Sequence, residues 1–447
     1  MDRATALTEL FLESLSAEDQ DLPNLRQAIT EVAADVITVE KNDADWAAAR
    51  VLRRLVEPDR VISFSVTWTD DAGDVQVNRG WRVQASNAIG PYKGGLRFHP
   101  DVTLDDLRFL AFEQCFKNAL TGLPLGGGKG GADFDPRGKS DAEVMRFCQA
   151  FMRQLAPHIG PDRDVPAGDI NVGAREIGYM FGAWSAASGT YAGAMTGKGL
   201  SYGGSEVRTE ATGYGLIYFV QAMLARAGRD LSEQRIAISG KGNVAIHAAR
   251  KALAERGKVV TLSDTSGTLY DPDGLDPAAI DWVAAQKAAG GDLSDPPATL
   301  RATFEADAQP WSFEADIALP CATQNEIDED AAKALVDNGV TVLAEGANMP
   351  TTAGALKVLR KAGVLYAPGK AANAGGVAVS GLEMSQMSHR RFMSAEEVDQ
   401  ALRTLMSDIH DRVAAEGQGG GSVDYARGAN LAGYRRLARA ITAQGVL

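Results

Sequence analysis

One lysine, Lys129, stands among five glycines in the stretch LPLGGGKGGADF, residues 123–134. Glycine loses more backbone freedom on folding than any other residue, so such a cluster needs a compensating reason. A phosphate-binding P-loop would need glycine at position 123 and serine or threonine after the lysine, but Leu123 and Gly130 stand there. Two interpretations stay open from the stretch alone. It is either a surface glycine loop with a solvated lysine, or a place where backbone and substrate approach closely around a lysine in a tight pocket.

Two more lysines stand out upstream, Lys93 in GPYKGGLRFHP and Lys117 in FEQCFKNALTGL. Two of the three lysines could bind the carboxylates of a dicarboxylate, which leaves the third for chemistry. A buried lysine near other lysines should have a lowered pKa through desolvation and like-charge repulsion, and it could then act as a general base near neutral pH. Asp169, in DVPAGDIN, is the matching acid–base candidate, although its local sequence by itself favours a turn or a helix N-cap.

Composition narrows the class of protein. The chain has 447 residues, of which 45% are hydrophobic, and a net charge of -13, which argues against a nucleic-acid or anionic-membrane binder. Its three cysteines are widely spaced and its five histidines show no paired ligand spacing, so we expect neither a disulfide framework nor a metal site. No signal sequence or long apolar run is apparent, and we expect a cytoplasmic protein.

The first part of the chain is predicted to form helices over residues 4–57 and a β-hairpin over 60–86 with its turn at 70–73. Thr103 and Asp106 form a capping-box pattern before a helix that runs to residue 120. Gln114 and Lys117 lie one turn apart on that helix and face the same direction. Lys129 would follow after a short loop.

The second part alternates strands and helices. A glycine- and serine-rich hinge is predicted at 196–205, followed by a helix at 211–228, a strand at 235–240, a helix at 243–257 and a strand at 258–264. Further strands are expected at 315–320, 341–346 and 364–369. This alternation predicts an α/β fold with a parallel sheet covered by helices.

A dinucleotide fingerprint lies in ISGKGNVA, as Gly240-x-Gly242-x-x-Ala245, and Asp264 ends the next strand. Gly240 would permit the tight turn, Gly242 would let the backbone approach a pyrophosphate, and the following helix would offer its N-terminal N–H groups. The alternative is a glycine-rich turn that binds nothing. A nicotinamide dinucleotide would carry hydride chemistry, and the upstream domain would then supply substrate contacts.

Six segments extend this interpretation over nearly the whole chain: GPYKGGLRFHP, PLGGGKGGADFDP, VPAGDI, ATGYG, EGANMPTT and APGKAANAGGVAVSGLEM. In this order they resemble the small, hexameric glutamate dehydrogenases, and the segment LSDTSG resembles the NADP-specific type. The resemblance implies roles for individual residues. Lys129 and Asp169 match the catalytic pair, and the substrate-binding positions are Lys93, Gln114, Lys117, Gly168 and Ser380. The cofactor side comprises Thr212, Gly240, Gly242, Asn243, Ser263, Asp264, Asn348 and Asn373.

The same resemblance implies reductive amination of 2-oxoglutarate with ammonium to L-glutamate. A carbinolamine would lose water to an iminium that accepts hydride, with Lys129 serving the water and carbonyl oxygen and Asp169 shuttling protons. It implies a substrate and assembly domain over 1–202 with a C-terminal helix, 425–447, returning to it, and a Rossmann-like domain over 203–424. The family fold further implies a homohexamer and a cleft that closes on substrate about a hinge near Gly203-Gly204.

Three alternatives remain at this point. A dehydrogenase of aliphatic or aromatic amino acids would share the chemistry, but should have apolar residues in place of Lys93 and Ser380. A catalytically silent nucleotide-binding protein could have lost Lys129 or Asp169, and both are present. For the coenzyme, Asp264 by itself favours NAD. Hydroxyls at Ser263, Thr265 and Ser266 favour NADP, which is our prediction. Lys241 in the glycine turn would add a positive charge nearby, although its local sequence by itself favours a solvated surface lysine.

Overall fold

The computed structural model describes residues 3–419 and 421–446, and the chain divides into two compact units. Unit 1 comprises Met1–Arg208, Ser380–Val398 and Asn430–Leu447, and unit 2 comprises Thr209–Val379 and Asp399–Ala429. These bounds differ from the expected 1–202 and 203–424, chiefly because residues 380–398 group with the first unit. The physical reason is visible at Glu383, whose carboxylate accepts hydrogen bonds from the backbone of residues 197 and 198.

Among the described residues, unit 1 contains a five-stranded sheet, eight α-helices and two short 3-10 helices before residue 209, and the C-terminal segments. Its strands are β1 (Arg60–Thr69), β2 (Val75–Ser86), β3 (Tyr92–Phe98), β4 (Gly127–Ala132) and β5 (Asp164–Gly168). Its helices before residue 209 are α1 (Arg3–Glu13), α2 (Ala17–Gln20), α3 (Pro23–Asn42), α4 (Ala44–Ala49), α5 (Val51–Val56), α6 (Leu104–Leu120), α7 (Asp141–Leu155), α8 (Ala174–Ser188) and the short 3-10 helices η1 (Ala156–His158) and η2 (Leu200–Tyr202).

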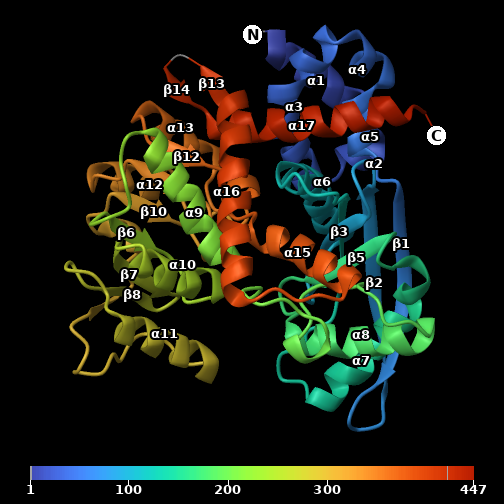
Figure 1. Ribbon diagram of the computed structural model, residues 1–447, viewed down its shortest axis with the longest axis horizontal. Coiled ribbons are helices and arrows are strands. Elements are labelled where there is room, and N and C mark those ends of the chain that lie inside the picture. The colour runs from blue at the N-terminus through green and yellow to red at the C-terminus, as the bar shows by residue number, and fades with distance from the viewer. Residues whose placement is uncertain (1–2, 420, 447) are drawn as a thin grey trace. The chain divides into compact units, whose positions relative to one another are not determined.

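The sheet of unit 1 has the strand order β1-β2-β4-β3-β5 (Figure 1). β1 and β2 form the predicted antiparallel hairpin, β2 pairs antiparallel with β4, and β3 pairs parallel with both β4 and β5. The capping box at Thr103 is present and begins α6, as predicted. A cluster of aromatic rings fills the core between this sheet and α7, with Phe134 and Phe147 stacked 3.7 Å apart.

The glycine stretch around Lys129 is the central strand β4, not a loop, and all six of its residues are buried. A Cβ atom on Gly127 would lie 2.2 Å from Cys115 Sγ of α6, and one on Gly131 would lie 2.3 Å from the carbonyl oxygen of Arg97 on β3. None of these glycines has a positive φ. The glycines are therefore required by close packing and not by an unusual backbone conformation, and the interpretation as a surface loop with a solvated lysine is wrong.

The C-terminal helix α17 (Tyr425–Gln444) returns to unit 1 as expected, and its later turns lie beside α3 (Figure 1). Asn430 donates a 2.7 Å hydrogen bond to Asp35, and the Tyr434 hydroxyl donates to the buried carboxylate of Glu40. Arg436 donates to the carbonyl oxygens at the end of α6, including a 2.8 Å bond to Ala119. The end of the chain is thus bound to α3 and, through Arg436, to the helix that carries Gln114 and Lys117.

Unit 2 is built on a seven-stranded sheet. Its strands are β6 (Arg235–Ile238), β7 (Lys258–Asp264), β8 (Gly267–Tyr270), β9 (Thr303–Ala306), β10 (Ile317–Leu319), β11 (Val342–Ala344) and β12 (Leu365–Ala367), with a separate small pair, β13 (Gln418–Gly419) and β14 (Ser422–Val423). Its helices are α9 (Ala211–Arg226), α10 (Asn243–Ala254), α11 (Pro277–Ala289), η3 (Pro310–Ser312), α12 (Glu329–Asp337), α13 (Ala353–Lys361) and α14 (Gly369–Ala372). Three helices contribute residues to both units: α15 (Gly375–His389), α16 (Ala395–Gly417) and α17.

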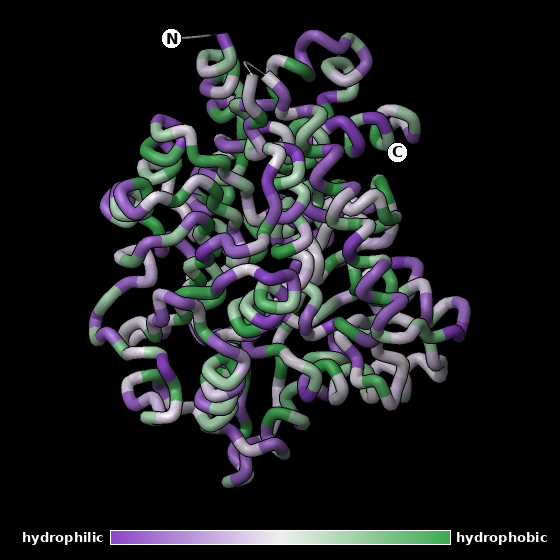
Figure 2. The backbone as a smooth tube through the Cα atoms, turned by 60° about the vertical axis from the view of Figure 1, so that its left-hand side comes forward, coloured by the Kyte–Doolittle hydropathy of each residue, from purple (hydrophilic) through white to green (hydrophobic). Residues whose placement is uncertain are grey.

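The strand order in unit 2 is β12-β11-β10-β6-β7-β8-β9, with parallel pairing from β12 to β7 and antiparallel pairing from β7 to β9. This is the expected Rossmann-like sheet with β6-α10-β7 at its centre. The antiparallel extension by β8 and β9 was not predicted. Figure 2 shows hydrophilic and hydrophobic residues mixed along the helical turns. Such mixing is typical of a helix that packs one face against a sheet and exposes the other face to water. Within the described residues, none of the helices combines the length and the apolar character needed to cross a membrane.

We expect Gly131→Ala to lower the free energy of unfolding by about 1–3 kcal/mol, because the new methyl group would overlap the backbone of Arg97. The matched control is Gly182→Ala in the middle of α8, where a Cβ meets no atom within 4 Å and helix propensity predicts a gain of roughly 1 kcal/mol. Thermal and urea unfolding of the two variants measure the difference. Equal behaviour of the two would contradict the close-packing role of β4.

Candidate functional site

Three charged side chains meet where β4, β3 and β5 lie side by side. Lys129 comes from the middle of β4, Arg97 from β3, and Asp169 follows the last residue of β5. Lys129 Nζ lies 2.9 Å from Asp169 Oδ1, and Arg97 Nε lies 2.8 Å from Asp169 Oδ2. Asp169 does not cap α8, whose N-cap residue is Gly173. The carboxylate therefore bridges two cations, and the predicted pair of Lys129 and Asp169 is in direct contact.

Burial and mutual charge set the protonation of this cluster. Lys129 is 4% exposed, and burial lowers its pKa, an effect that Asp169 opposes and Arg97 reinforces. Burial also works against ionisation of Asp169, but the charges of Lys129 and Arg97 outweigh it and hold the pKa of that carboxyl below its usual range. Asp169 is consequently ionised at neutral pH. Lys129 loses its proton more readily than an ordinary lysine.

Lys117 and Gln114, on α6, belong to the same neighbourhood. Burial, followed by repulsion from Lys129 and offset in part by Asp169, lowers the pKa of Lys117 to about 8. Gln114 donates a 2.6 Å hydrogen bond to Asn118, which in turn donates to the carbonyl oxygen of Lys93 at 3.1 Å. Asn118 thus connects the side chain of Gln114 to the backbone of Lys93. The sequence interpretation missed Asn118, although it lies one turn beyond Gln114 on the helix already identified.

Lys93, on β3, is 2% exposed and is surrounded by other charges. Its pKa is well below the ordinary value, first through burial and then through the charges of Arg208 and Arg82, while Glu383 and Asp164 oppose the shift. Arg82 is itself held by Asp164 through a 2.9 Å bond from its Nε and donates to the carbonyl oxygen of Gly94. A buried ammonium in such surroundings is stabilised by an anion that enters beside it.

Ser380 is buried on α15, and its hydroxyl accepts a 3.3 Å hydrogen bond from the hydroxyl of Thr196. Gly168 ends β5 directly before Asp169, and a Cβ there would lie 2.3 Å from the carbonyl oxygen of Val172. The sequence interpretation missed Arg97 and Thr196. The strand register offered a signal for Arg97, because residues 93, 95 and 97 of one strand point to the same face.

In unit 2, the fingerprint glycines form the turn between β6 and α10. Gly240 has φ 87°, and a Cβ on it would lie 3.2 Å from Cβ of Ala322. At Gly242, the N-cap of α10, a Cβ would meet no described atom within 4 Å, and no side-chain hydrogen bond of the described residues caps this end. An open backbone approach to an uncapped helix N-terminus fits the pyrophosphate of a dinucleotide.

Asp264, the acid that ends β7, already has hydrogen-bond partners on both carboxylate oxygens. Asp264 Oδ2 lies 2.5 Å from Lys241 Nζ and accepts a 3.0 Å bond from the backbone N–H of Leu293, while Oδ1 accepts 2.9 and 2.5 Å bonds from the backbone and hydroxyl of Ser266. Burial raises the pKa of this carboxyl, but these hydrogen bonds and the charge of Lys241 leave it below the usual value. Lys241 is therefore not a solvated surface lysine. Ser263 is also engaged, because its hydroxyl accepts the N–H of Gly240 at 2.9 Å.

The remaining predicted cofactor residues lie on four segments of unit 2. The amide of Asn373 donates to the carbonyl oxygens of residues 346 and 347 and, at 3.2 Å, to the side chain of Asn348. Asn243 begins α10 and donates a 2.6 Å bond to the carbonyl oxygen of Thr209. Thr212 lies in the first turn of α9. Asn348 and Asn373 are thus brought together, and Asn243 is linked to the segment that precedes Thr212.

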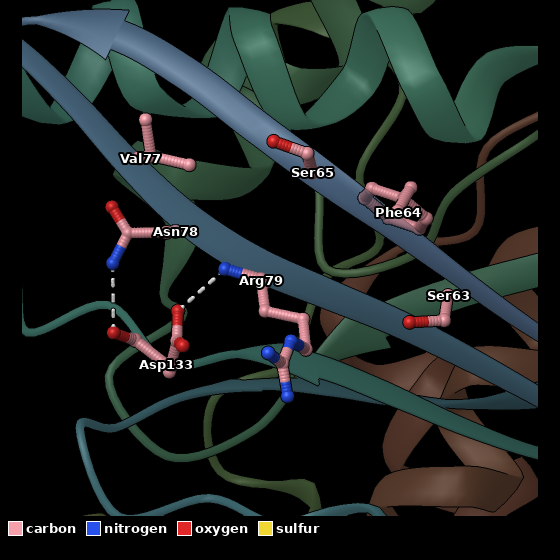
Figure 3. Close-up of a pocket in the computed structure, with 7 residues that line it drawn as sticks. All are labelled: Ser63, Phe64, Ser65, Val77, Asn78, Arg79 and Asp133. Carbon is pink, nitrogen blue, oxygen red and sulfur yellow. Dashed lines mark hydrogen bonds between the residues drawn. The ribbon is translucent and has the colours of Figure 1, made fainter.

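An open depression of about 380 Å³ lies elsewhere in unit 1, over β1, β2 and the residue after β4 (Figure 3). Two hydrogen bonds join residues that line it: the Asp133 carboxylate accepts the backbone N–H of Arg79 at 2.7 Å, and the Asp133 carbonyl oxygen accepts the amide of Asn78 at 2.8 Å. None of the predicted site residues lines it. Among the described residues there is also no cluster of side chains suited to hold a metal ion.

Comparisons with known proteins agree with this geometry. The profile described as glutamate/leucine/phenylalanine/valine dehydrogenase matches residues 203–445, and that of the Glu/Leu/Phe/Val dehydrogenase dimerisation domain matches residues 58–186. The chain belongs to the glutamate/leucine/phenylalanine/valine dehydrogenase family. Membership in this family confirms the resemblance drawn from the six segments.

Three relatives illustrate the family match. The NADP-specific glutamate dehydrogenase of Psychrobacter sp. (strain TAD1) is 52% identical over 98% of each chain. The NAD-specific glutamate dehydrogenase of Bacteroides fragilis (strain YCH46) is 50% identical over 98% of this chain and 99% of the relative. The crystal structure of Plasmodium falciparum glutamate dehydrogenase superposes with a TM-score of 0.96 at 41% identity, covering 99% of this chain and 96% of the other. The α/β fold with its Rossmann-like second sheet is confirmed.

Lys117 should react unusually fast with an amine-acylating reagent. With a pKa of about 8, about half of its amines are neutral at pH 8, against roughly 0.3% for an ordinary lysine. Lys258 is the matched control, because its hydrogen bond to Glu233 raises its pKa although it is more exposed. Peptide mapping by mass spectrometry across pH 6–10 should give a labelling midpoint near 8 for Lys117. Parallel profiles for the two lysines would contradict the lowered pKa.

Proposed function

We propose that the protein is an NADP-dependent glutamate dehydrogenase that aminates 2-oxoglutarate reductively, and reversibly, with ammonium to L-glutamate. The observation that carries this proposal is the bridged cluster of Lys129, Asp169 and Arg97, with two further buried or partly buried lysines in the same unit. Full-length relatives named as NADP-specific glutamate dehydrogenases support it.

The proposed substrate contacts follow from the surplus of positive charge on the lysines of unit 1. Lys117, Gln114 and the backbone around Gly168 would bind the α-carboxylate. Lys93 and Ser380 would bind the distal carboxylate, with a charge-assisted bond from the ammonium and a hydrogen bond from the hydroxyl. A substrate with an uncharged side chain would leave the ammonium of Lys93 buried without an anion, which penalises aliphatic amino acids.

Proton handling falls to Lys129 and Asp169. The lowered pKa of Lys129 lets its amine give and take a proton at the substrate carbonyl oxygen and at the water that is lost. Asp169, held ionised, stabilises the positive charge of the ammonium and the iminium. It can also accept a proton released by the substrate nitrogen and pass it to the neutral amine of Lys129 across their 2.9 Å contact. When bound, NADPH supplies the hydride.

The choice of NADP over NAD is supported by the pairing of Asp264. An acid at this position selects NAD only when a carboxylate oxygen is free to accept the ribose 2′-hydroxyl. Here both oxygens already accept hydrogen bonds, and Lys241 neutralises the charge that would repel a 2′-phosphate. Lys241 would itself bind the 2′-phosphate. Within unit 2, Thr212, Asn243, Asn348 and Asn373 would contact the rest of the cofactor.

We also propose that the protein assembles as a homohexamer and acts in the cytoplasm. A related glutamate dehydrogenase from Thermus thermophilus is described as hetero-hexameric, and residues 58–186 match a dimerisation domain. The three cysteines are buried and unpaired, in keeping with a reducing compartment. Light scattering on the purified protein should give six times the subunit mass.

The decisive test of the activity is oxidation of NADPH by the purified protein. We expect turnover that requires 2-oxoglutarate and ammonium together, with L-glutamate as the product. Faster turnover of an uncharged 2-oxo acid than of 2-oxoglutarate would contradict the proposed substrate and favour a dehydrogenase of aliphatic or aromatic amino acids.

Lys129→Ala should reduce kcat by about 10²- to 10⁴-fold, because it removes a proton-transfer group. Binding of NADPH, followed by its fluorescence, should stay near the wild-type level because Lys129 lies in unit 1 and the fingerprint turn in unit 2. A variant that keeps more than about a tenth of the wild-type rate at saturating substrate would exclude Lys129 from the chemical step.

Lys241→Ala should lower the ratio of kcat/KM for NADPH to that for NADH by about tenfold or more, because it leaves the carboxylate of Asp264 facing the 2′-phosphate without its partner. Calorimetry compares the affinity for adenosine 2′,5′-bisphosphate with the affinity for 5′-AMP. It therefore tests the preference for a 2′-phosphate without turnover. Lys333→Ala, which removes an exposed lysine from unit 2, is the control and should leave both ratios unchanged. A preference unaltered by Lys241→Ala would show that the coenzyme is selected elsewhere.

A further inference from the structure

The most deeply buried lysine–carboxylate pair of unit 1 that the proposed chemistry does not use is Lys198 with Glu383. Both side chains are 0% exposed, and Lys198 Nζ lies 2.5 Å from Glu383 Oε1. Taking two charges out of water costs more than their attraction returns unless further hydrogen bonds complete the arrangement. The neighbours of this pair indicate what it is for.

Glu383 holds a short loop of unit 1 in place. Its Oε2 accepts the backbone N–H of Gly197 at 2.8 Å, and Oε1 accepts that of Lys198 at 3.3 Å. The ammonium of Lys198 also donates a 2.6 Å bond to the carbonyl oxygen of Met195. One carboxylate and one ammonium therefore fix residues 195–198 from both ends, with Thr196 between the anchored positions.

The fixed loop leads directly to the proposed distal-carboxylate pocket. Thr196 is fully buried, its backbone N–H donates a 3.0 Å bond to the carbonyl oxygen of Pro166, and its hydroxyl donates to Ser380. Ser380 and Glu383 lie three residues apart on α15 and so share a face of that helix. The same helical turn thus presents the hydroxyl of Ser380 and secures the loop that aims the hydroxyl of Thr196 at it.

Glu383 also acts on the charge of the pocket. Lys93 is buried and experiences the positive charges of Arg208 and Arg82, all of which favour its neutral form, whereas the carboxylate of Glu383 favours the ammonium. Only the ammonium form makes a charge-assisted bond to a carboxylate. The geometry of the hydroxyls and the charge of the lysine therefore both depend on this carboxylate.

We propose that Glu383, held by Lys198, is a positioning residue that gives the pocket of Lys93, Thr196 and Ser380 its preference for a distal carboxylate over an uncharged side chain. This inference rests on the proposed function. Neither residue contacts the substrate in this account, and each acts through Thr196, Ser380 or Lys93.

Three variants separate this role from a structural one. Glu383→Gln removes the charge but leaves Lys198 buried without a carboxylate, so it should also lower stability. The double variant Lys198→Met with Glu383→Gln removes both charges and keeps an amide oxygen for the N–H of Gly197. Asp19→Asn is the matched control, because it removes the carboxylate from another buried pair of unit 1, with Arg108, whose residues we assign no part in the pocket.

Three measurements are made on each purified full-length variant. Calorimetry compares binding of glutarate, which has both carboxylates but no 2-oxo group, with binding of butyrate, which lacks the distal carboxylate. Steady-state kinetics compares KM and kcat for 2-oxoglutarate and for 2-oxopentanoate, and thermal unfolding reports stability.

We expect both Glu383 variants to weaken glutarate binding and to raise KM for 2-oxoglutarate by about tenfold or more, the effect of losing support for a hydrogen bond to a charged group. Butyrate binding, KM for 2-oxopentanoate and KM for NADPH should change by less than about twofold, and the double variant should recover stability without recovering glutarate affinity. Asp19→Asn should lose stability with no change in selectivity. Recovery of both stability and glutarate affinity in the double variant, or equal loss for glutarate and butyrate, would overturn the proposal. Failure of the wild-type protein to aminate 2-oxoglutarate would instead overturn the proposed function, since the calorimetric comparison needs no turnover.

Discussion

The close packing of β4 between β2 and β3 is the constraint on which the site of unit 1 depends. Four of its six residues are glycine, which leaves the strand almost without side chains, so the backbones of β3 and α6 approach to distances that a Cβ would not allow. Because glycine carries an entropic cost in a strand, this packing requires support from the aromatic core around Phe147. The result is a rigid strand, and Lys129 is the only long side chain that projects from it.

The balance of charges around β4 then determines which kind of ligand the site can bind. Lys129 and Arg97 share the single carboxylate of Asp169, and Lys117 lies close enough for its pKa to respond to both members of the pair. The local sum is positive and mostly removed from water, a state that an entering carboxylate would relieve. The protein as a whole carries a net charge of -13, so this positive cluster is a local property that overall composition does not reveal.

The sequence allowed much of the fold to be predicted, because its signals are local. The hairpin, the capped helix α6 and the β6-α10-β7 unit follow from alternation, capping and spacing within short windows. The strand β4 was not predicted, and its stretch stayed open between a surface loop and a tight pocket, since a run of glycines has neither strand propensity nor hydrophobic alternation. Only its neighbours in space make it a strand. Arg97 and Thr196 were missed for a related reason. Their partners, Asp169 and Ser380, lie 72 and 184 residues away in the sequence.

Asp264 shows why a motif residue cannot be interpreted apart from its hydrogen bonds. An acid at the end of the second strand of a dinucleotide fold is the usual partner of a ribose hydroxyl, and its identity can be seen from sequence alone. What decides its effect is whether a lone pair remains available, and that depends on Lys241 in the glycine turn, Ser266 two residues on, and a backbone N–H at Leu293. The last of these comes from a segment 29 residues away, after an intervening hairpin strand and helix, so no short window contains it. An acid with all of these partners behaves as part of the scaffold, and the proposed contact with the 2′-phosphate falls to Lys241, the positive charge that it orients.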